Sequence, residues 1–121
     1  MVKRPQATQR ILIVDDDEIV REIMASILQH EGYQCQSVPN GVDALTLLEA
    51  GKKFDLITSD ICNLPMWGTD FLKELKRRFP MIPTLVITGC GALPFDCLRK
   101  DAACDYQTLL TAIRRKLNHW E

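Results

Sequence analysis

Short apolar runs alternate along the chain with longer segments of helical periodicity, and this alternation restricts the possible folds more than any other feature. Strands that are joined through helices run parallel, with crossover helices on both faces of the sheet. The sequence therefore predicts a single α/β domain with a doubly wound, five-stranded parallel sheet. The predicted strands cover residues 11–14, 33–38, 54–60 and 84–89, with a marginal fifth strand at 103–106.

The segments between these strands have the pattern of amphipathic helices. After the first strand, apolar residues recur at the spacing that places them on one face of a helix, and Gly32 suits the end of that helix. Pro80 would terminate a later helix, because proline cannot continue one. Helices are predicted over 17–31, from about 41 to Gly51, over 69–79, over 94–100 and from about 108 to the end of the chain.

Composition excludes several classes of protein. The chain has 121 residues, which is close to the commonest size of one domain. Fifteen basic and sixteen acidic residues give a net charge of -1, which argues against a nucleic-acid-binding stripe or a polybasic membrane patch. Five scattered cysteines without a CxxC pair indicate a reduced, cytoplasmic protein. We expect residues 1–9 to be flexible and the domain to cover residues 10–121.

An acidic run directly follows the first predicted strand, where residues 11–20 read ILIVDDDEIV. Carboxylates packed this closely beside an apolar core are costly unless something neutralises them. One interpretation is that such aspartates are helix caps, and we expect Asp17 or Glu18 to cap the first helix. The other interpretation is a cation site.

The cation site depends on which side chains share one edge of the sheet. Asp15 and Asp16 leave the first strand, Asp60 leaves the third and Thr88 leaves the fourth. In open parallel sheets, ligands bind beyond the carboxyl ends of the strands, where strand order reverses. Oxygen ligands with several carboxylates suit a hard cation such as Mg²⁺. The sequence therefore predicts that these residues converge on a magnesium site.

A set of short motifs along the chain resembles the response-regulator receiver domain of two-component signalling. The resemblance extends from about Ile11 to Trp120 and implies the flavodoxin-like form of the doubly wound sheet. Each motif is weak alone, but together they follow the order and nearly the spacing of the family. The motifs are ILIVDDDE, NGVDAL, DLITSDI, PMWG, LVITG and ACDY.

The resemblance implies a phosphoacceptor and a metal site. Asp60 would be the carboxylate nucleophile that takes a phosphoryl group from a phosphohistidine on a partner kinase. Asp15, Asp16 and Asp60 would hold Mg²⁺ or Mn²⁺, with the backbone carbonyl of Cys62 as a further ligand. The domain would be regulatory rather than an enzyme, and at most would catalyse its own phosphorylation and dephosphorylation.

The resemblance also implies a switch, and here the sequence departs from the family. Thr88 would bond a phosphoryl oxygen, and Tyr106 occupies the place of the switch aromatic on the fifth strand. The family normally has a lysine and then a proline after that strand, whereas this chain has Leu109 and Leu110. Arg99 and Lys100, expected in the fourth helix, offer no convincing substitute. Phosphorylation is therefore expected to be slow or weakly coupled to the switch.

Three functions remain open at this stage. The first is a Mg²⁺-dependent phosphoacceptor, and the second is a receiver-like binding module that works without phosphate. The third is an aspartate-nucleophile phosphatase with a D-x-D motif in the acidic run. Expected partners are a sensor histidine kinase or phosphotransfer protein and a downstream protein, with a possible homodimer and without nucleic acid or membrane. The chain would be either a single-domain regulator or a fragment of a longer one.

Overall fold

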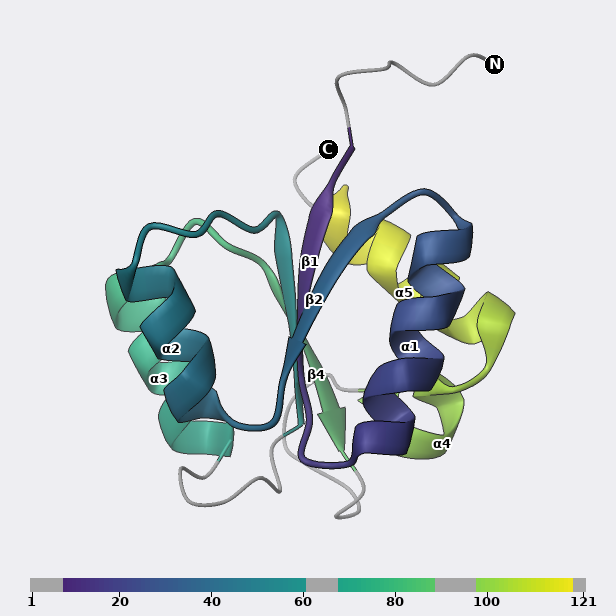
Figure 1. The fold of residues 1–121 in the computed structure, drawn as a ribbon, viewed down its shortest axis with the longest axis horizontal. Coiled ribbons are helices and arrows are strands. Elements are labelled where there is room, and N and C mark those ends of the chain that lie inside the picture. The colour runs from purple at the N-terminus through teal and green to yellow at the C-terminus, as the bar shows by residue number, and fades with distance from the viewer. Residues whose placement is uncertain (1–7, 61–67, 89–97, 119–121) are drawn as a thin grey trace.

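Five parallel strands form one sheet at the centre of the fold (Figure 1). The computed structural model describes residues 8–60, 68–88 and 98–118, and within them the strands lie in the order β2-β1-β3-β4-β5. The prediction of a doubly wound, five-stranded parallel sheet is confirmed. The strands are β1 (Arg10–Val14), β2 (Gln34–Val38), β3 (Leu56–Asp60), β4 (Thr84–Thr88) and β5 (Leu98–Arg99).

Helices cover both faces of the sheet. The first and last helices lie on one face with the short fourth helix near them, and the second and third lie on the other face (Figure 1). No helix in the described ranges is long and apolar enough to cross a bilayer. The helices are α1 (Glu18–His30), α2 (Gly41–Glu49), α3 (Gly68–Arg78), α4 (Lys100–Ala103) and α5 (Tyr106–Leu117).

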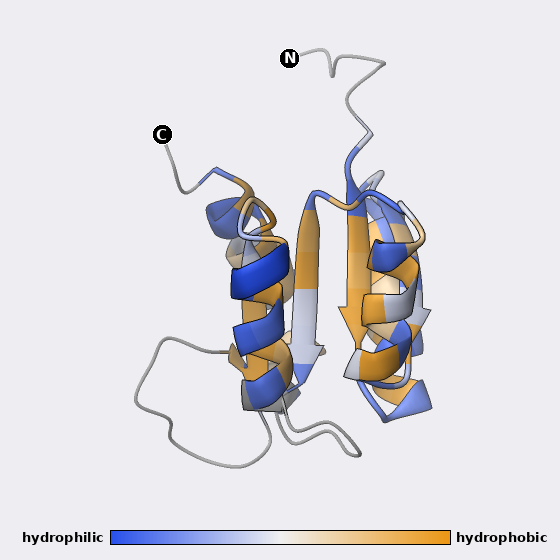
Figure 2. Cartoon of the chain, turned by 90° about the vertical axis from the view of Figure 1, so that its left-hand side faces the viewer, coloured by the Kyte–Doolittle hydropathy of each residue, from blue (hydrophilic) through white to orange (hydrophobic). Residues whose placement is uncertain are grey.

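The central strand β1 is apolar at successive positions because both of its faces are covered. Ile11 and Ile13 pack into the core beneath α1 and α5, whereas Leu12 and Val14 pack into the core beneath α2 and α3. All four side chains are almost completely buried. Figure 2 shows the same arrangement as apolar strands enclosed by helices with hydrophilic outer surfaces. The four-residue apolar run therefore holds the two layers of the domain together.

Polar side chains cap the helices where the chain leaves the strands. Asp17 accepts hydrogen bonds from the backbone N of Ile19 at 2.9 Å and of Val20 at 3.3 Å, which confirms one of the two caps predicted for α1. Asn40 caps α2 by accepting from the backbone N of Asp43 at 2.8 Å. Each cap satisfies a backbone donor that the first turn of a helix leaves without a partner.

The α2 and α3 helices approach closely at a glycine. A Cβ atom at Gly41 would lie 2.9 Å from Cγ of Phe71, and Phe71 is almost fully buried in the core between these helices. A side chain at position 41 would therefore force the ring of Phe71 to move. The absence of a side chain at Gly41, the first residue of α2, therefore allows Phe71 of α3 to pack against it.

The predicted fifth strand at 103–106 is wrong. Strand β5 consists of Leu98 and Arg99, which pair with Ile87 and Thr88 of β4. Residues 103–106 instead include the end of α4 and the first residue of α5. Of the helix predicted at 94–100, residues 94–97 lie outside the described residues, and α4 begins only at Lys100. Arg99 therefore ends strand β5 instead of lying in a helix, whereas Lys100 is the first residue of α4.

A capping interaction explains this error. The Asp105 side chain accepts a hydrogen bond from the backbone N of Thr108 at 3.0 Å and another from its hydroxyl at 2.7 Å. These bonds, the hydroxyl bond first, lower the pKa of Asp105. An aspartate followed three residues later by a bonded threonine is a strong signal for the start of a helix. Residues 103–106 therefore do not form a strand, because the Asp105 cap starts α5 at Tyr106.

Tyr106 joins the start of α5 to the end of α1. Its hydroxyl donates a hydrogen bond to Oε2 of Glu31 and lies 2.9 Å from Nδ1 of His30. Nη2 of Arg114 donates to Oε1 of the same Glu31 at 3.2 Å. The hydrogen bond from Tyr106 is the largest of the effects that hold the pKa of Glu31 below its usual value. This contact fixes α5 against α1.

Leu109 is completely buried in the core beneath α1 and α5. It belongs to the first turns of α5 and so does not follow a strand in this structure. Its backbone N bonds the carbonyl of Asp105 at 2.9 Å, as a helical residue does. The physical role of Leu109 is therefore packing.

We expect Leu109→Lys to lower the free energy of unfolding by more than about 3 kcal/mol, because it places an ammonium group in a buried apolar position. Leu109→Met is the matched control and should cost about 1 kcal/mol or less, since it conserves volume and polarity. Urea unfolding followed by circular dichroism measures both. Equal stability of the two variants would contradict the buried position of this side chain.

Candidate metal centre

Three carboxylates converge at the carboxyl ends of β1 and β3. These strands pair in register, with Val14 opposite Ser59, so the residues that follow them meet at one edge of the sheet. Asp15, Asp16 and Asp60 each bring one carboxylate oxygen to within 4.8 Å of the others. This confirms that the three aspartates lie together as the sequence predicted.

The three carboxylates differ in their exposure to solvent. Asp15 and Asp60 are 1% and 2% exposed, whereas Asp16 is exposed. Two buried acids side by side repel each other strongly in a medium of low dielectric constant. The exposed Asp16 gives the cluster one side that faces solvent, from which a hydrated ion or a reactant can approach.

The donor set fits a hard divalent cation. All three groups offer carboxylate oxygens, which are the ligands that Mg²⁺ and Mn²⁺ prefer, and no described histidine or cysteine shares the cluster. Mg²⁺ usually takes one or two protein carboxylates and keeps several waters. The backbone carbonyl predicted as a further ligand belongs to Cys62, which lies outside the described residues.

The backbone around Asp15 is held by its neighbours. Oδ1 of Asp15 accepts a hydrogen bond from the backbone N of Asp17 at 2.8 Å, and the same Asp17 caps α1. Nη1 of Arg21 donates to the backbone carbonyl of Asp15 at 2.7 Å. The residues of the acidic run therefore have different roles, since Asp15 and Asp16 belong to the carboxylate cluster and Asp17 caps the helix.

Arg21 is a residue near the site that the sequence analysis did not find. It brings a guanidinium group to the backbone of Asp15, and its positive charge acts on the carboxylates nearby. The signal available in the sequence was its position on the second turn of the helix that begins in the acidic run. Nothing in the sequence alone indicated that its side chain turns back toward the strand.

Thr88 ends β4 at the same edge of the sheet. It is 2% exposed, and the register places Asp60 opposite Ile87, one residue before Thr88. Thr88 thus brings a buried hydroxyl group to the edge of the sheet at which the Asp60 carboxylate lies. Tyr106 lies elsewhere, at the contact between α5 and α1, so its coupling to Thr88 stays a prediction.

Comparison with known proteins gives the wider context of this site. Residues 11–104 match the family described as response regulator receiver domain. The match ends before Tyr106 and Leu109, both of which lie in α5.

Two curated regulators and one solved structure illustrate the likeness. The DNA-binding transcriptional regulator NtrC of Escherichia coli K12 is 31% identical over 92% of this chain, which covers 25% of that protein. The transcriptional regulatory protein ZraR of Klebsiella oxytoca is 40% identical over 69% of this chain, which covers 18% of that protein. The chain thus spans a quarter or less of the length of these relatives.

The solved structure is a response regulator receiver domain protein, CheY-like, from Methanospirillum hungatei JF-1. It is 28% identical to this chain and superposes with a TM-score of 0.84, covering 93% of this chain and 96% of the other. The doubly wound sheet and its helices therefore have the flavodoxin-like form that the resemblance implied.

We expect Mg²⁺ to stabilise the folded protein, because a cation that binds only the folded state lowers its free energy. At ten times its dissociation constant the gain is about 1.4 kcal/mol, or roughly 5 °C in melting temperature for a domain of this size. Differential scanning fluorimetry with and without Mg²⁺ measures the shift.

Asp16→Asn should reduce this Mg²⁺-dependent shift, since it removes one charge from the cluster while leaving the core intact. Glu22→Gln, an exposed acid on α1, is the matched control and should keep the full shift. A melting temperature that ignores Mg²⁺ in the unmodified protein would count against a metal centre.

Proposed function

The chain belongs to the response regulator receiver domain family, and on this premise we propose that Asp60 accepts a phosphoryl group from a phosphohistidine. The donor would be a sensor histidine kinase or a phosphotransfer protein, acting in the cytoplasm. The observation that carries the proposal is the convergence of Asp15, Asp16 and Asp60 at the carboxyl ends of β1 and β3. The cluster combines a buried nucleophile with a charged and solvent-accessible neighbour.

The proposed transfer requires only groups that meet at this edge. A carboxylate oxygen of Asp60 attacks the phosphorus atom, a new O–P bond forms, and the P–N bond to the donor histidine breaks with its electron pair returning to the ring. Catalysis of such a transfer consists mainly of positioning and of stabilising the charge on the phosphoryl oxygens. The position of Asp60 is fixed by the pairing of β3 with both β1 and β4.

Charge must be offset for an anionic phosphoryl group to enter an acidic site. Receiver domains generally bind Mg²⁺ at an acidic pocket, and Asp15, Asp16 and Asp60 would hold it here with the carbonyl of Cys62. The cation would neutralise both the carboxylates and the phosphoryl oxygens. Thr88 would donate its hydroxyl hydrogen to a phosphoryl oxygen from the end of β4.

A basic pair at the end of β5 supplies a further candidate for charge stabilisation. Arg99 ends β5 opposite Thr88, and Lys100 is the first residue of α4. Both therefore stand at the same edge of the sheet as Asp60. Nε of Arg99 lies 3.5 Å from Oδ1 of the exposed Asp101, and this ion pair makes Arg99 the weaker candidate. The family's lysine would then be replaced by Lys100 rather than lost at Leu109.

An apolar surface beside the cluster suits a protein donor. Ile19 is 67% exposed and Ile23 is 37% exposed, and the two lie one turn apart on α1. Large apolar side chains at this level of exposure are unusual unless a partner covers them. A histidine-bearing helix that packed on this face would bring its phosphoryl group close to Asp16 and Asp60.

The position of Tyr106 supports a second candidate function, a receiver-like binding module. Its hydroxyl is bonded to Glu31 at the end of α1, which favours a receiver-like module whose partner binding does not depend on phosphate. The two functions differ in one measurement, the backbone amide chemical shifts of α4 and α5 with acetyl phosphate and Mg²⁺. Shifts in these helices support a phosphate-driven switch, whereas labelling without such shifts supports the module.

We expect acetyl phosphate and Mg²⁺ to add one phosphoryl group to the protein and Asp60→Asn to abolish the gain, because the amide is not a nucleophile. Intact mass spectrometry measures the addition. Asp101→Asn, an exposed acid on α4, should label like the unmodified protein. Labelling of the Asp60→Asn variant would move the phosphosite elsewhere, and steady release of phosphate would indicate a phosphatase instead.

We expect Lys100→Ala to slow this labelling by about a hundredfold to a thousandfold, the usual effect of removing one group that stabilises a transition state electrostatically. Lys73→Ala is the control, since Lys73 is an exposed lysine on α3. The rate of mass gain over time separates the two variants. Equal rates would show that Lys100 has no part in the transfer, and slow labelling of the unmodified protein would then follow from the missing family lysine.

A further inference from the structure

Two cavities adjoin at the end of the sheet opposite the carboxylate cluster. The first has a volume of about 270 Å³ and lies where α3 ends and β4 begins, with Lys76 of α3 and Lys116 of α5 on its border. The second has a volume of about 290 Å³ and lies beside the end of α2, with Lys52 and Lys53 on its border.

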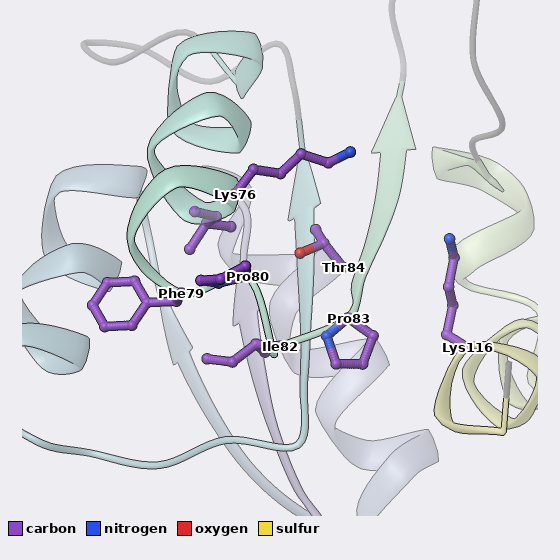
Figure 3. A pocket seen from close by; sticks show the side chains of 8 residues that line it. Lys76, Phe79, Pro80, Ile82, Pro83, Thr84 and Lys116 are labelled. Atoms are coloured by element: carbon purple, nitrogen blue, oxygen red, sulfur yellow. The ribbon is translucent and has the colours of Figure 1, made fainter. Parts of the chain in front are cut away.

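The two cavities form one continuous surface because they share residues. Phe79 and Ile82, both half-buried, line both of them. In Figure 3, Lys76 reaches out from α3 and Lys116 from α5 on either side of Pro83 and Thr84. We call this surface the basic groove, defined by Lys52, Lys53, Lys76, Phe79, Ile82 and Lys116.

The ionisable side chains that line the basic groove are all positively charged. Each ionisable residue that lines it in the described part of the chain is a lysine. The acids of the nearby helices bond arginines instead. Nη2 of Arg78 lies 2.5 Å from Oε2 of Glu49, and Nη2 of Arg77 lies 2.9 Å from Oε1 of Glu74. Lys52, Lys53 and Lys76 take no part in these two ion pairs, and together they add up to a local positive potential.

The floor of the basic groove is apolar. Leu75 and Phe54 lie beneath it and are almost fully buried, while Phe79 and Ile82 keep part of their surface exposed. Met81, which lies between Phe79 and Ile82 in the sequence, is 89% exposed and lines neither cavity. An apolar floor with a charged border is typical of surfaces that bind another protein.

From these features we propose that the basic groove docks an acidic segment of a partner protein that carries large apolar side chains. The apolar side chains would fill the two cavities over Phe79 and Ile82, and the acidic residues would meet the lysines on the border. Each cavity is slightly smaller than the roughly 300–1,000 Å³ of small-molecule sites, which suits single side chains of a peptide.

Other polyanions fit less well. A nucleic acid would be repelled by the acidic opposite end of a chain whose net charge is -1, and its phosphates would leave the apolar floor uncovered. A bilayer is too flat to fill a concave groove, since membrane-surface sites present their apolar side chains outward. A second copy of this chain could offer the run from Asp16 to Ile19, and the experiment must distinguish this case.

The proposal is tested by selection from a random peptide library of about 12 residues, displayed on phage, against the full chain. We expect the enriched peptides to combine several acidic residues with large apolar ones. Binding of these peptides, measured by fluorescence anisotropy, should weaken as salt is raised from roughly 50 to 500 mM. Failure to enrich any sequence, or enrichment of neutral or basic peptides, would overturn the proposal.

Two charge-reversed variants locate the binding surface. Lys53→Glu with Lys76→Glu alters both cavities and should weaken peptide binding by at least about tenfold. Lys73→Glu with Arg115→Glu is the matched control, because it changes the net charge equally at exposed positions outside the groove. It should change binding by less than about threefold. Equal losses in both variants would mean that only overall charge matters, and would overturn the proposal.

A matched pair of apolar variants tests the floor of the groove. Ile82→Ala should weaken binding of the selected peptides, whereas Met81→Ala, its exposed neighbour, should not.

Tighter binding to vesicles of phosphatidylserine and phosphatidylcholine than to any selected peptide would favour a membrane instead. Self-association of the full chain in analytical ultracentrifugation, lost in the groove variant, would favour a second copy. Mass labelling of Asp60 should be unchanged in the groove variant, so the proposed phosphotransfer and the docking site can fail independently.

Discussion

The parallel pairing of β1 with β3 is the constraint on which the rest of the structure depends. It places the residues after Val14 beside those after Ser59, and so forces Asp15, Asp16 and Asp60 into one volume. This concentration of negative charge is tolerable because both strands are anchored by apolar side chains on two faces. The unfavourable free energy of bringing the carboxylates together is thus offset by apolar packing that does not involve them.

The domain separates its charges along the strands. Acids gather at the carboxyl ends, where Asp16, Asp17 and Glu18 are exposed, and lysines gather around the basic groove at the opposite end. The two ends nearly cancel in the net charge of -1, so composition alone hides the separation. The proposed phosphoryl donor at the acidic end and the proposed acidic partner at the basic groove would therefore approach the domain from opposite sides.

Sequence reasoning predicted the parts of the fold that depend on local patterns. The first four strands, the Asp17 cap and the convergence of the three aspartates follow from apolar runs and from the rules of parallel sheets. The fifth strand could not be predicted, because the Asp105 cap starts a helix at Tyr106, where the sequence showed only a weak strand pattern. The basic groove was also invisible, since its lysines come from three separate segments that only the fold brings together.

The small size of β5 has a consequence for how the domain can move. Within the described residues, two residues of β5 pair with β4, whereas β1 pairs along its length with β2 and over four positions with β3. Segments with few ladder bonds can open locally at a free energy well below that of global unfolding. The edge that carries Arg99 and Lys100 can therefore behave as a separate cooperative unit, able to rearrange while Asp60 stays anchored between its neighbouring strands.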